Sequence, residues 1–106
     1  QENLEKFLDS DLLHNLSHLD LSDNIIFDDR MTPFLEQFNS KNLVHLNLRN
    51  CGLSFDSLKH LFENKHFSTL RDIDLSSNYD IDQFVIKLAK TETLNKLRKL
   101  SVSNTY

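Results

Sequence analysis

Several polar residues of this sequence recur at intervals of 27 and are of types that could do chemistry. Asp20 and Asp74 are two intervals apart, with Asn47 between them. If each interval is one strand of a parallel sheet, the two carboxylates lie roughly 10 Å apart. That separation is near the one between the acid and the base of inverting glycoside hydrolases. His18 and His45 are one interval apart and could instead bind a metal ion together with a nearby aspartate.

A third arrangement, Ser22 with His45 and Asp72, has the residue types of a hydrolytic triad. No nucleophile elbow and no recognisable oxyanion donors accompany the serine. Nothing in the sequence favours the protonated form of the two spaced carboxylates, and polar residues at regular intervals on a sheet are ordinarily solvated. We therefore predict no catalytic residue, no metal site, no cofactor and no enzymatic activity. Cys51 is interpreted as a small buried residue rather than as a catalytic or redox thiol.

The elements that must position these residues follow from one repeated motif. Residues 43–53 read Leu-x-x-Leu-x-Leu-x-x-Cys-x-Leu, and the pattern recurs with opening leucines at Leu16, Leu43, Leu70 and Leu97. Apolar and polar residues alternate through its centre, which predicts a short strand with one buried face. A fixed interval of this length is typical of repeat proteins, in which each unit packs on the next.

A second apolar pattern lies between the motifs and predicts a helix in each unit. With the opening leucine as place 1, places 16, 19 and 20 are apolar, which is the spacing of one helical stripe. The stripes are Met31, Phe34, Leu35; Leu58, Leu61, Phe62; and Val85, Leu88, Ala89. Asp28 or Asp29, Asp56 and Asp82 lie just before them and suit helix N-termini. Pro33 is tolerated only in a first turn, so we expect the first helix to begin near Thr32 and to be the shortest.

The register divides the chain into a single domain, residues 1–106, with unequal ends. Residues 16–42, 43–69 and 70–96 form complete units, residues 97–106 form a partial unit, and residues 1–15 form a half-unit with a helix expected at 2–10. The half-unit could cover the first end of the core. The last motif stops at its turn, so we expect an open strand edge that is truncated, covered by a partner or paired with itself.

Composition excludes several classes of function. A net charge of −4 gives no electrostatic footprint for nucleic acid, and the sequence has no apolar run long enough to span a membrane. A single cysteine cannot build a disulfide framework, which favours a reducing, cytoplasmic compartment. We therefore expect the partner to be another protein, with no nucleic acid and no membrane involved.

The motif resembles that of leucine-rich repeat proteins. Its period, its helical segments and the alternation of Asn24, Cys51 and Asn78 resemble the ribonuclease-inhibitor-like subclass. The resemblance implies an α/β solenoid, with a short parallel sheet of about four strands on the concave face and helices on the convex face. The richness in Asn, Lys, Ile and Phe also resembles the effectors that intracellular bacteria such as Legionella deliver into the host-cell cytoplasm.

Two positions depart from the family pattern. Asp80 stands where the last apolar residue of the third motif belongs, and we expect Ile81 to substitute for it. Thr105 stands in the fourth motif where asparagine or cysteine belongs.

Side chains at places 3, 5 and 7 of each motif are expected to point away from the core, with places 2 and 8 at the margins. This polar face supplies the candidate partner-binding residues: His18, Asp20, Asp23, His45, Asn47, Arg49, Asp72, Asp74 and Lys99. Acids and histidines occupy the first strands, and basic residues such as Arg71, Arg98 and Lys99 occupy the last. We expect the partner to carry the reverse gradient of charge.

The sequence therefore predicts a protein-binding module. Its sharper form, which the family resemblance allows, is an inhibitor that covers the active site of an enzyme, either a host protein or a fellow effector. The alternative is a structural scaffold, a fragment of a longer leucine-rich repeat protein with no site of its own.

Overall fold

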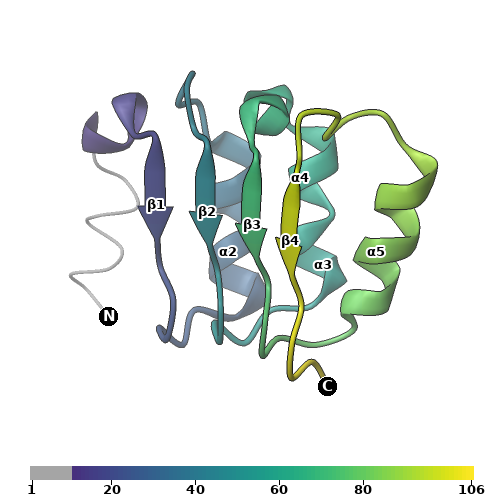
Figure 1. The fold of residues 1–106 in the computed structure, drawn as a ribbon. Coiled ribbons are helices and arrows are strands. Elements are labelled where there is room, and N and C mark those ends of the chain that lie inside the picture. Colours follow the sequence, from purple (N-terminus) through teal and green to yellow (C-terminus); the bar gives the residue numbers. More distant parts are fainter. Residues whose placement is uncertain (1–10) are drawn as a thin grey trace.

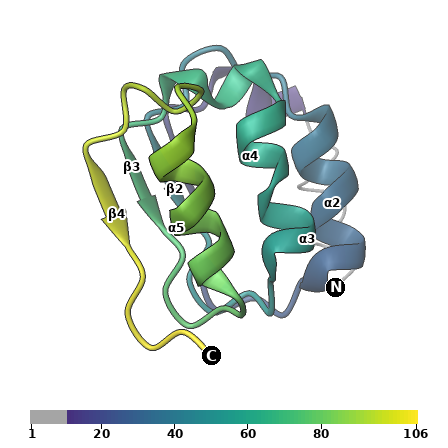
Figure 2. The same cartoon turned by 90° about the vertical axis from the view of Figure 1, so that its right-hand side faces the viewer.

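The computed structural model describes residues 11–106. In chain order the elements are η1 (Asp11–Asn15), β1 (His18–Asp20), α2 (Phe27–Gln37), β2 (His45–Asn47), α3 (Phe55–Leu58), α4 (His60–Glu63), η2 (Lys65–Thr69), β3 (Asp72–Asp74), α5 (Ile81–Lys90) and β4 (Lys99–Ser101). They form two layers, with the strands in one and the α-helices in the other (Figures 1 and 2). The helix predicted at residues 2–10 lies outside the described residues. None of the helices in residues 11–106 combines the length and the apolar character that crossing a lipid bilayer requires.

The four strands are parallel and follow one another in sequence order across the sheet. His18 pairs with His45, His45 with Asp72, and Asp72 with Lys99, so each strand is in register with the next at an interval of 27 residues. This arrangement agrees with the predicted α/β class and its parallel sheet. The curvature of a solenoid and the boundaries of the units remain predictions.

The motif leucines fill the space between the two layers. In the second unit Leu43, Leu48 and Leu53 have no exposed surface, and Leu46 is 2% exposed. Only the middle residue of β1, β2 and β3 is buried, because successive side chains of a strand point to opposite faces. One face of the sheet is therefore committed to the core and the other is left to solvent.

The prediction for the first helix was wrong. Helix α2 begins at Phe27 rather than near Thr32, and it carries Pro33 in its interior. An interior proline costs about 3 kcal/mol, but a start at Thr32 would leave Met31 outside the helix. Met31, Phe34 and Leu35 are all buried, and a helix that begins at Phe27 places all three on one inner stripe. The burial of Met31, about 1.5–3 kcal/mol, offsets much of the cost of the proline, which itself lies on the exposed side.

The prediction for the third stripe was also wrong. In α5, Val85 and Ala89 are exposed and Leu88 is only half-buried, whereas Ile81 and Phe84 are buried. Ile81 takes the place that Asp80 vacates, as predicted, and Asp80 adopts a left-handed conformation with φ 53°. In the first two units the next helix covers the stripe, as in the packing of α2 against α3. No element of residues 11–106 covers α5 in this way.

The carboxylate of Asp28 joins one helix to the next. It accepts hydrogen bonds from the backbone N–H of Ser54 at 2.9 Å and from the hydroxyl groups of Ser54 and Ser57. Ser54 is the N-cap of α3, so Asp28 stabilises the start of the neighbouring helix. Asp29 stays exposed. The sequence assigned this acidic pair to the start of its own helix, whereas Asp28 also supports the start of the next one.

The turns are joined by a second feature, which we call the turn column: Asn24, Cys51 and Asn78, at place 9 of successive motifs. Cys51 and Asn78 are buried, and Asn24 is exposed. Asn78 has no exposed surface. Its Oδ1 accepts from the backbone N–H groups of Cys51 and Leu53 at 3.2 and 3.0 Å. Its Nδ2 donates to the carbonyl oxygens of Leu48 and Leu75 at 2.8 and 3.0 Å. One side chain thereby satisfies four buried backbone groups, each of which would cost about 1–3 kcal/mol if left unpaired.

Candidate functional site

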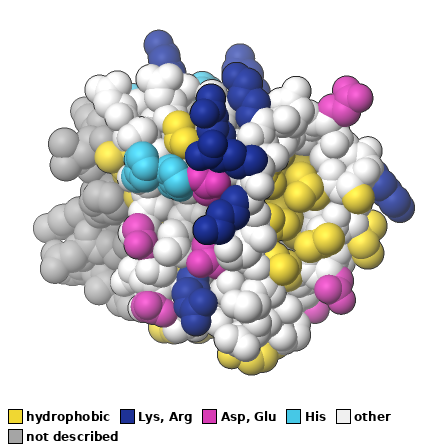
Figure 3. Space-filling view, viewed as in Figure 1, with side chains coloured by type: hydrophobic (Ala, Val, Ile, Leu, Met, Phe, Trp, Pro, Cys, Tyr) yellow, Lys and Arg dark blue, Asp and Glu magenta, His cyan; other side chains and the backbone are white. Residues whose placement is uncertain are grey.

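The solvent face of the sheet carries a shallow hollow of about 790 Å³. It is lined by residues of all four strands: His18, Leu19, Asp20, His45, Leu46, Asn47, Asp72, Ile73, Asp74, Arg98, Lys99 and Ser101. Figure 3 looks onto this face and shows the histidines beside acidic side chains, with basic side chains next to them. Its lining combines polar side chains of the strands with Leu19, Leu46 and Ile73.

The residues at place 3 of the four strands form what we call the face column: His18, His45, Asp72 and Lys99. The rings of His18 and His45 stack, with centroids 4.3 Å apart and planes 19° from parallel. Nδ1 of His45 lies 2.9 Å from Oδ2 of Asp72, whose Oδ1 lies 3.6 Å from Nε of Arg98. The Asp72 carboxylate is thus held from both sides, and its side chain is only 16% exposed.

These contacts fix how His45 is presented. An ionised Asp72 is only an acceptor, so Nδ1 of His45 must be the donor of their hydrogen bond. Its Nε2 has no hydrogen-bond partner within residues 11–106, and the side chain is 42% exposed. Nδ1 of His18 is engaged by the hydroxyl group of Ser17 at 2.9 Å. The face column therefore presents the edges of two imidazole rings and, at Lys99, a cationic side chain. The contacts just described hold the rings in place.

The residues at place 5 have a different role. Oδ1 of Asp20 accepts from the backbone N–H of Ser22 at 2.9 Å, and Oδ1 of Asp74 accepts from that of Ser76 at the same distance. Asn47 makes the equivalent bond in the second motif. Hydrogen bonds from the hydroxyl group and then the backbone N–H of Ser22 lower the pKa of Asp20 below its usual value. These hydrogen bonds turn the chain at the ends of β1, β2 and β3. The second carboxylate oxygen of Asp20 and Asp74 and the amide nitrogen of Asn47 are therefore the groups left for a partner.

Two predicted site residues lie away from the hollow, and two polar residues outside the predicted set line it. Asp23 sits in the first turn with φ 62° and accepts a hydrogen bond from Nδ2 of Asn50 at 3.0 Å. Arg49 is half-buried beyond the end of β2. Arg98 and Ser101 line the hollow instead. The sequence placed Arg98 only at the margin, because the reach of a long side chain across its strand to Asp72 has no signature in the spacing of residues.

The catalytic arrangements considered from the sequence find no support in the geometry. The hydroxyl group of Ser22 donates to Asp20 at 2.6 Å, so it is engaged outside any triad with His45. The lowered pKa of Asp20 is the opposite of what a general acid requires. Within the described residues, no three His, Cys, Asp or Glu side chains come together as a metal ion would need.

Cys51 is a structural residue. It has no exposed surface, and its thiol donates to the carbonyl oxygen of Leu21 at 3.1 Å. Burial raises the pKa of the Cys51 thiol to about 11, with a smaller contribution from the charges of Asp23 and Asp20. The reactive thiolate is therefore scarce near pH 7.

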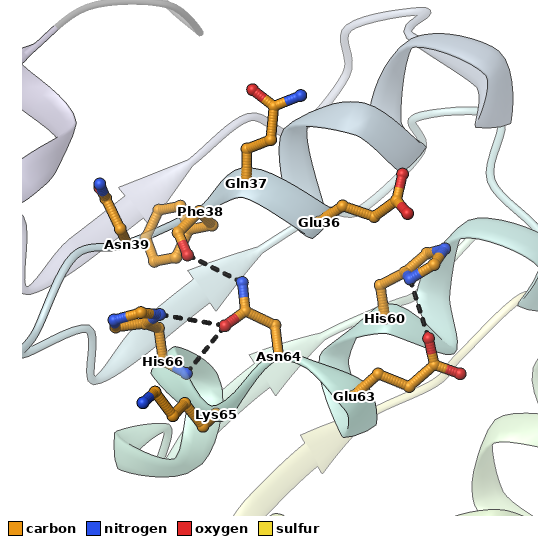
Figure 4. A pocket seen from close by; sticks show the side chains of 9 residues that line it. All are labelled: Glu36, Gln37, Phe38, Asn39, His60, Glu63, Asn64, Lys65 and His66. Carbon is orange, nitrogen blue, oxygen red and sulfur yellow. Dashed lines mark hydrogen bonds and ion pairs between the residues drawn. The ribbon is translucent and has the colours of Figure 1, made fainter.

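A second hollow, of about 500 Å³, lies where the end of α2 meets α4 and η2 (Figure 4). Asn64 is central to it: its Nδ2 donates to the carbonyl oxygen of Phe38 at 2.8 Å, and its Oδ1 accepts from the backbone N–H of His66 at 3.0 Å. Nδ1 of His60 lies 3.1 Å from a carboxylate oxygen of Glu63. The asparagine ties consecutive units together, so its polar groups are already used for structure.

Comparison with known proteins finds a family match for part of the chain. The family model described as Leucine Rich Repeat matches residues 42–64, which contain β2, α3 and α4. No curated protein and no solved structure matches the chain. The match supports a leucine-rich repeat protein; such repeats are generally not enzymes, and they typically bind other proteins.

Proposed function

We propose that the solvent face of the sheet binds another protein, with the face column at the centre of the contact. The observation that carries this proposal is the set of contacts from His18 through His45 and Asp72 to Arg98. These contacts hold polar side chains in place before any partner arrives. A partner that meets a preset surface loses less conformational entropy on binding, which favours affinity and specificity.

The charges of the face indicate the chemistry of the partner. Asp20 and Asp74 each keep an oxygen free of the turn hydrogen bond, which suits an arginine or lysine of the partner. Lys99 is exposed on the last strand and suits a carboxylate. The partner surface would therefore be basic opposite β1 and acidic opposite β4.

In its finer form the proposal is that the partner is an enzyme, a host protein or a fellow effector, whose active site the face covers. This step rests on the resemblance to ribonuclease-inhibitor-like repeats. The hollow over the four strands could receive a protruding rim of such an enzyme. The interface would then bury on the order of 1,600 Å² in total, as stable protein complexes do.

Site-specific photo-crosslinking tests the binding surface. A benzophenone amino acid at position 99, in the lining of the hollow, is compared with the same probe at position 29, which is exposed on the helix side. Each protein is irradiated in lysates of the source cell and of its host. We expect a discrete adduct from position 99 and none from position 29. Equal adducts from both positions, or none from either, would contradict the proposal and favour a scaffold.

A captured protein is then purified and its affinity measured for two variants, His45→Ala and Lys99→Glu. Neither residue makes the turn hydrogen bonds of place 5, so loss of binding would report on contact rather than on folding. We expect each to weaken binding about 5–30-fold, since truncating a contributing interface residue costs about 1–2 kcal/mol. If the captured protein is an enzyme, its activity should fall on adding the chain. Binding without inhibition would remove the finer form and leave the binding surface standing.

A further inference from the structure

The turns that follow the strands carry a row of exposed apolar side chains. Place 10 of successive motifs holds Ile25, Gly52, Tyr79 and Tyr106. Ile25 and Tyr79 are each 48% exposed, and Phe27, two residues after Ile25, is 53% exposed. We call Ile25, Phe27 and Tyr79 the edge row. The loops between the strands and the helices that follow them lie at the lower edge of the sheet in Figure 1.

Phe27 closes the gap that the glycine leaves in this row. A Cβ atom added to Gly52 would lie 2.6 Å from Cδ1 of Phe27, so the ring lies directly over the glycine. The backbone N–H of Phe27 also donates to the carbonyl oxygen of Cys51 at 3.0 Å. The start of α2 is thereby anchored to the turn of the next unit, with the ring held in one place.

The backbone of Phe27 is strained although its ring is largely exposed. Its φ of 63° lies in the left-handed region, which is unfavourable for a bulky residue and which asparagine adopts more readily. Because more than half of the residue remains in solvent, packing within the described part of the chain offsets only part of this strain. Strained positions of this kind cluster where a side chain is held ready for a ligand.

Further repeats would lengthen the edge row and would not cover it. Phe27 lies between the first and second motifs, and Tyr79 is followed by the fourth, yet both stay about half exposed. The ring of Tyr106 lies 5.4 Å from that of Tyr79, so the next motif continues the row at its side. A unit stacked at either end would therefore leave Phe27 and Tyr79 accessible.

The charges around the edge row are of one sign. At places 6–15 of the first three motifs, every exposed charged side chain is a carboxylate, and the two arginines there, Arg30 and Arg49, are half-buried. Asp80 directly follows Tyr79 in the sequence. The exposed acids are Asp23, Asp29, Asp56, Asp80 and Asp82. The edge row is thus an apolar strip with an acidic border.

We propose that the edge row binds a segment of a partner protein in which arginines alternate with apolar side chains. A guanidinium group stacks on aromatic rings and also pairs with carboxylates, and both are present here. A second copy is disfavoured because two acidic borders would meet, and the negative surface of an anionic membrane is disfavoured for the same reason. None of the three residues of the row lines the hollow on the sheet face, so this is a separate surface.

Three synthetic peptides of equal length, blocked at both ends, are the probes: four repeats of Arg-Leu, of Arg-Ser and of Glu-Leu. Their binding to the chain is measured by titration calorimetry. We expect the Arg-Leu peptide to bind at least about tenfold more tightly than either of the others, because it alone supplies both apolar contact and positive charge. Equal binding of Arg-Ser would reduce the contact to charge attraction, and equal binding of Glu-Leu would exclude charge matching. Either result, or no binding of Arg-Leu, would overturn the proposal.

Substitutions in the row test the apolar contact. Phe27→Asn removes the ring and suits the left-handed backbone, so we expect binding of the Arg-Leu peptide to fall about tenfold or more with little change in the melting temperature. Tyr79→Ser should weaken it in the same direction and serves as the test if Phe27→Asn unfolds. Ile86→Ser is the matched control, because Ile86 is 54% exposed on α5, outside the row, and it should leave binding unchanged.

A second pair of variants tests the acidic border and the location of the peptide. Asp23→Asn/Asp80→Asn removes two charges at positions with φ 62° and 53°, which asparagine tolerates, and should weaken binding about 2–30-fold. His45→Ala, on the sheet face, should leave it unchanged. Loss of binding with His45→Ala but not with Phe27→Asn would place the peptide in the hollow. That result would overturn this proposal and leave the proposed function of the sheet face standing.

Hydroxyl-radical footprinting of the chain without peptide separates the other occupants. We expect Phe27 and Tyr79 to be oxidised readily and to become protected when the Arg-Leu peptide is added. Protection without peptide in a sample that sediments as a dimer would identify a second copy, and protection in a monomer would identify another segment of the same polypeptide. Binding to phosphatidylserine vesicles that Phe27→Asn abolishes would identify a membrane surface. Each of these three results would overturn the proposal.

Discussion

Two columns of side chains cross the sheet at the same interval, one through the turns and one over the solvent face. In the turn column, Asn78 is fully buried and all of its hydrogen-bonding groups are engaged with backbone. In the face column, His45 is 42% exposed and uses only one ring nitrogen within residues 11–106. The same periodicity therefore serves architecture where polar groups are saturated, and it leaves hydrogen-bonding groups available for the proposed partner where they are open.

The largest effect on stability should come from removing a buried side chain of the turn column. Asn78→Ala removes the partners of four buried backbone groups, and we expect a loss of about 4 kcal/mol or more in the free energy of unfolding. Asn24→Ala is the matched control: Asn24 holds the same place but is exposed, and it donates within its own turn. Its loss should be below about 1 kcal/mol. Urea denaturation of both variants checks this, and equal losses would end the distinction between buried and exposed members of one column.

The next effect concerns Asp28, an acidic side chain of the helix layer that is saturated like the turn column. Asp28→Ala removes the acceptor of three hydrogen bonds to Ser54 and Ser57, and we expect a loss of about 2–3 kcal/mol. Asp29→Ala, its exposed neighbour, should change stability by less than about 0.5 kcal/mol. Thermal melts of the pair would show whether hydrogen-bond saturation, rather than location in the fold, identifies a structural residue.

A pH titration tests the second member of the turn column. The pKa of Cys51 is about 11 in the folded protein against 9.0 for an unperturbed thiol, so the folded state holds this proton more tightly. Its stabilising contribution is complete below about pH 9 and is lost as the pH rises to 11, a change of about 2–3 kcal/mol. Lysines and tyrosines titrate in the same range, so the measurement is the difference between wild type and Cys51→Ala in urea at pH 8 and 10.5. A constant difference would contradict the burial of the thiol.

The smallest effect on stability should come from the face column. Asp72→Asn weakens contacts with His45 and Arg98 at the surface, and we expect a change below about 1 kcal/mol. A loss as large as that of Asn78→Ala, measured in the same denaturation series, would make the face column structural and would remove the basis for assigning it to a partner.

Much of the architecture could be predicted because the repeat itself encodes it. An interval of 27 residues fixes the strand register, and alternation within each motif fixes which face is buried. His18, His45, Asp72 and Lys99 could therefore be aligned with one another from their spacing alone. The sequence also indicated Ile81 as the substitute for Asp80. These features depend on local pattern and on a constant period, and both can be read along the chain.

The features that the sequence did not reveal depend on contacts between units. Packing against a neighbouring unit buries the apolar stripe of α2, which contains Pro33. Val85 of α5 has no such neighbour among residues 11–106 and is exposed. The role of Asp28 depends on serines 26 and 29 residues further on. Arg98 reaches Asp72 only once two strands are paired. In each case the cause is the geometry of packing, which the one-dimensional period does not contain.

The constant spacing of these contacts also has a consequence for how the chain folds. Side-chain hydrogen bonds between units of the described part span from 24 to 30 residues of chain. Because the entropy lost on closing a loop depends on its length, each pair of adjacent strands closes a loop of nearly the same cost. No pairing has to wait for the two ends of the chain to meet. Folding can therefore begin between any two neighbouring strands and extend in both directions.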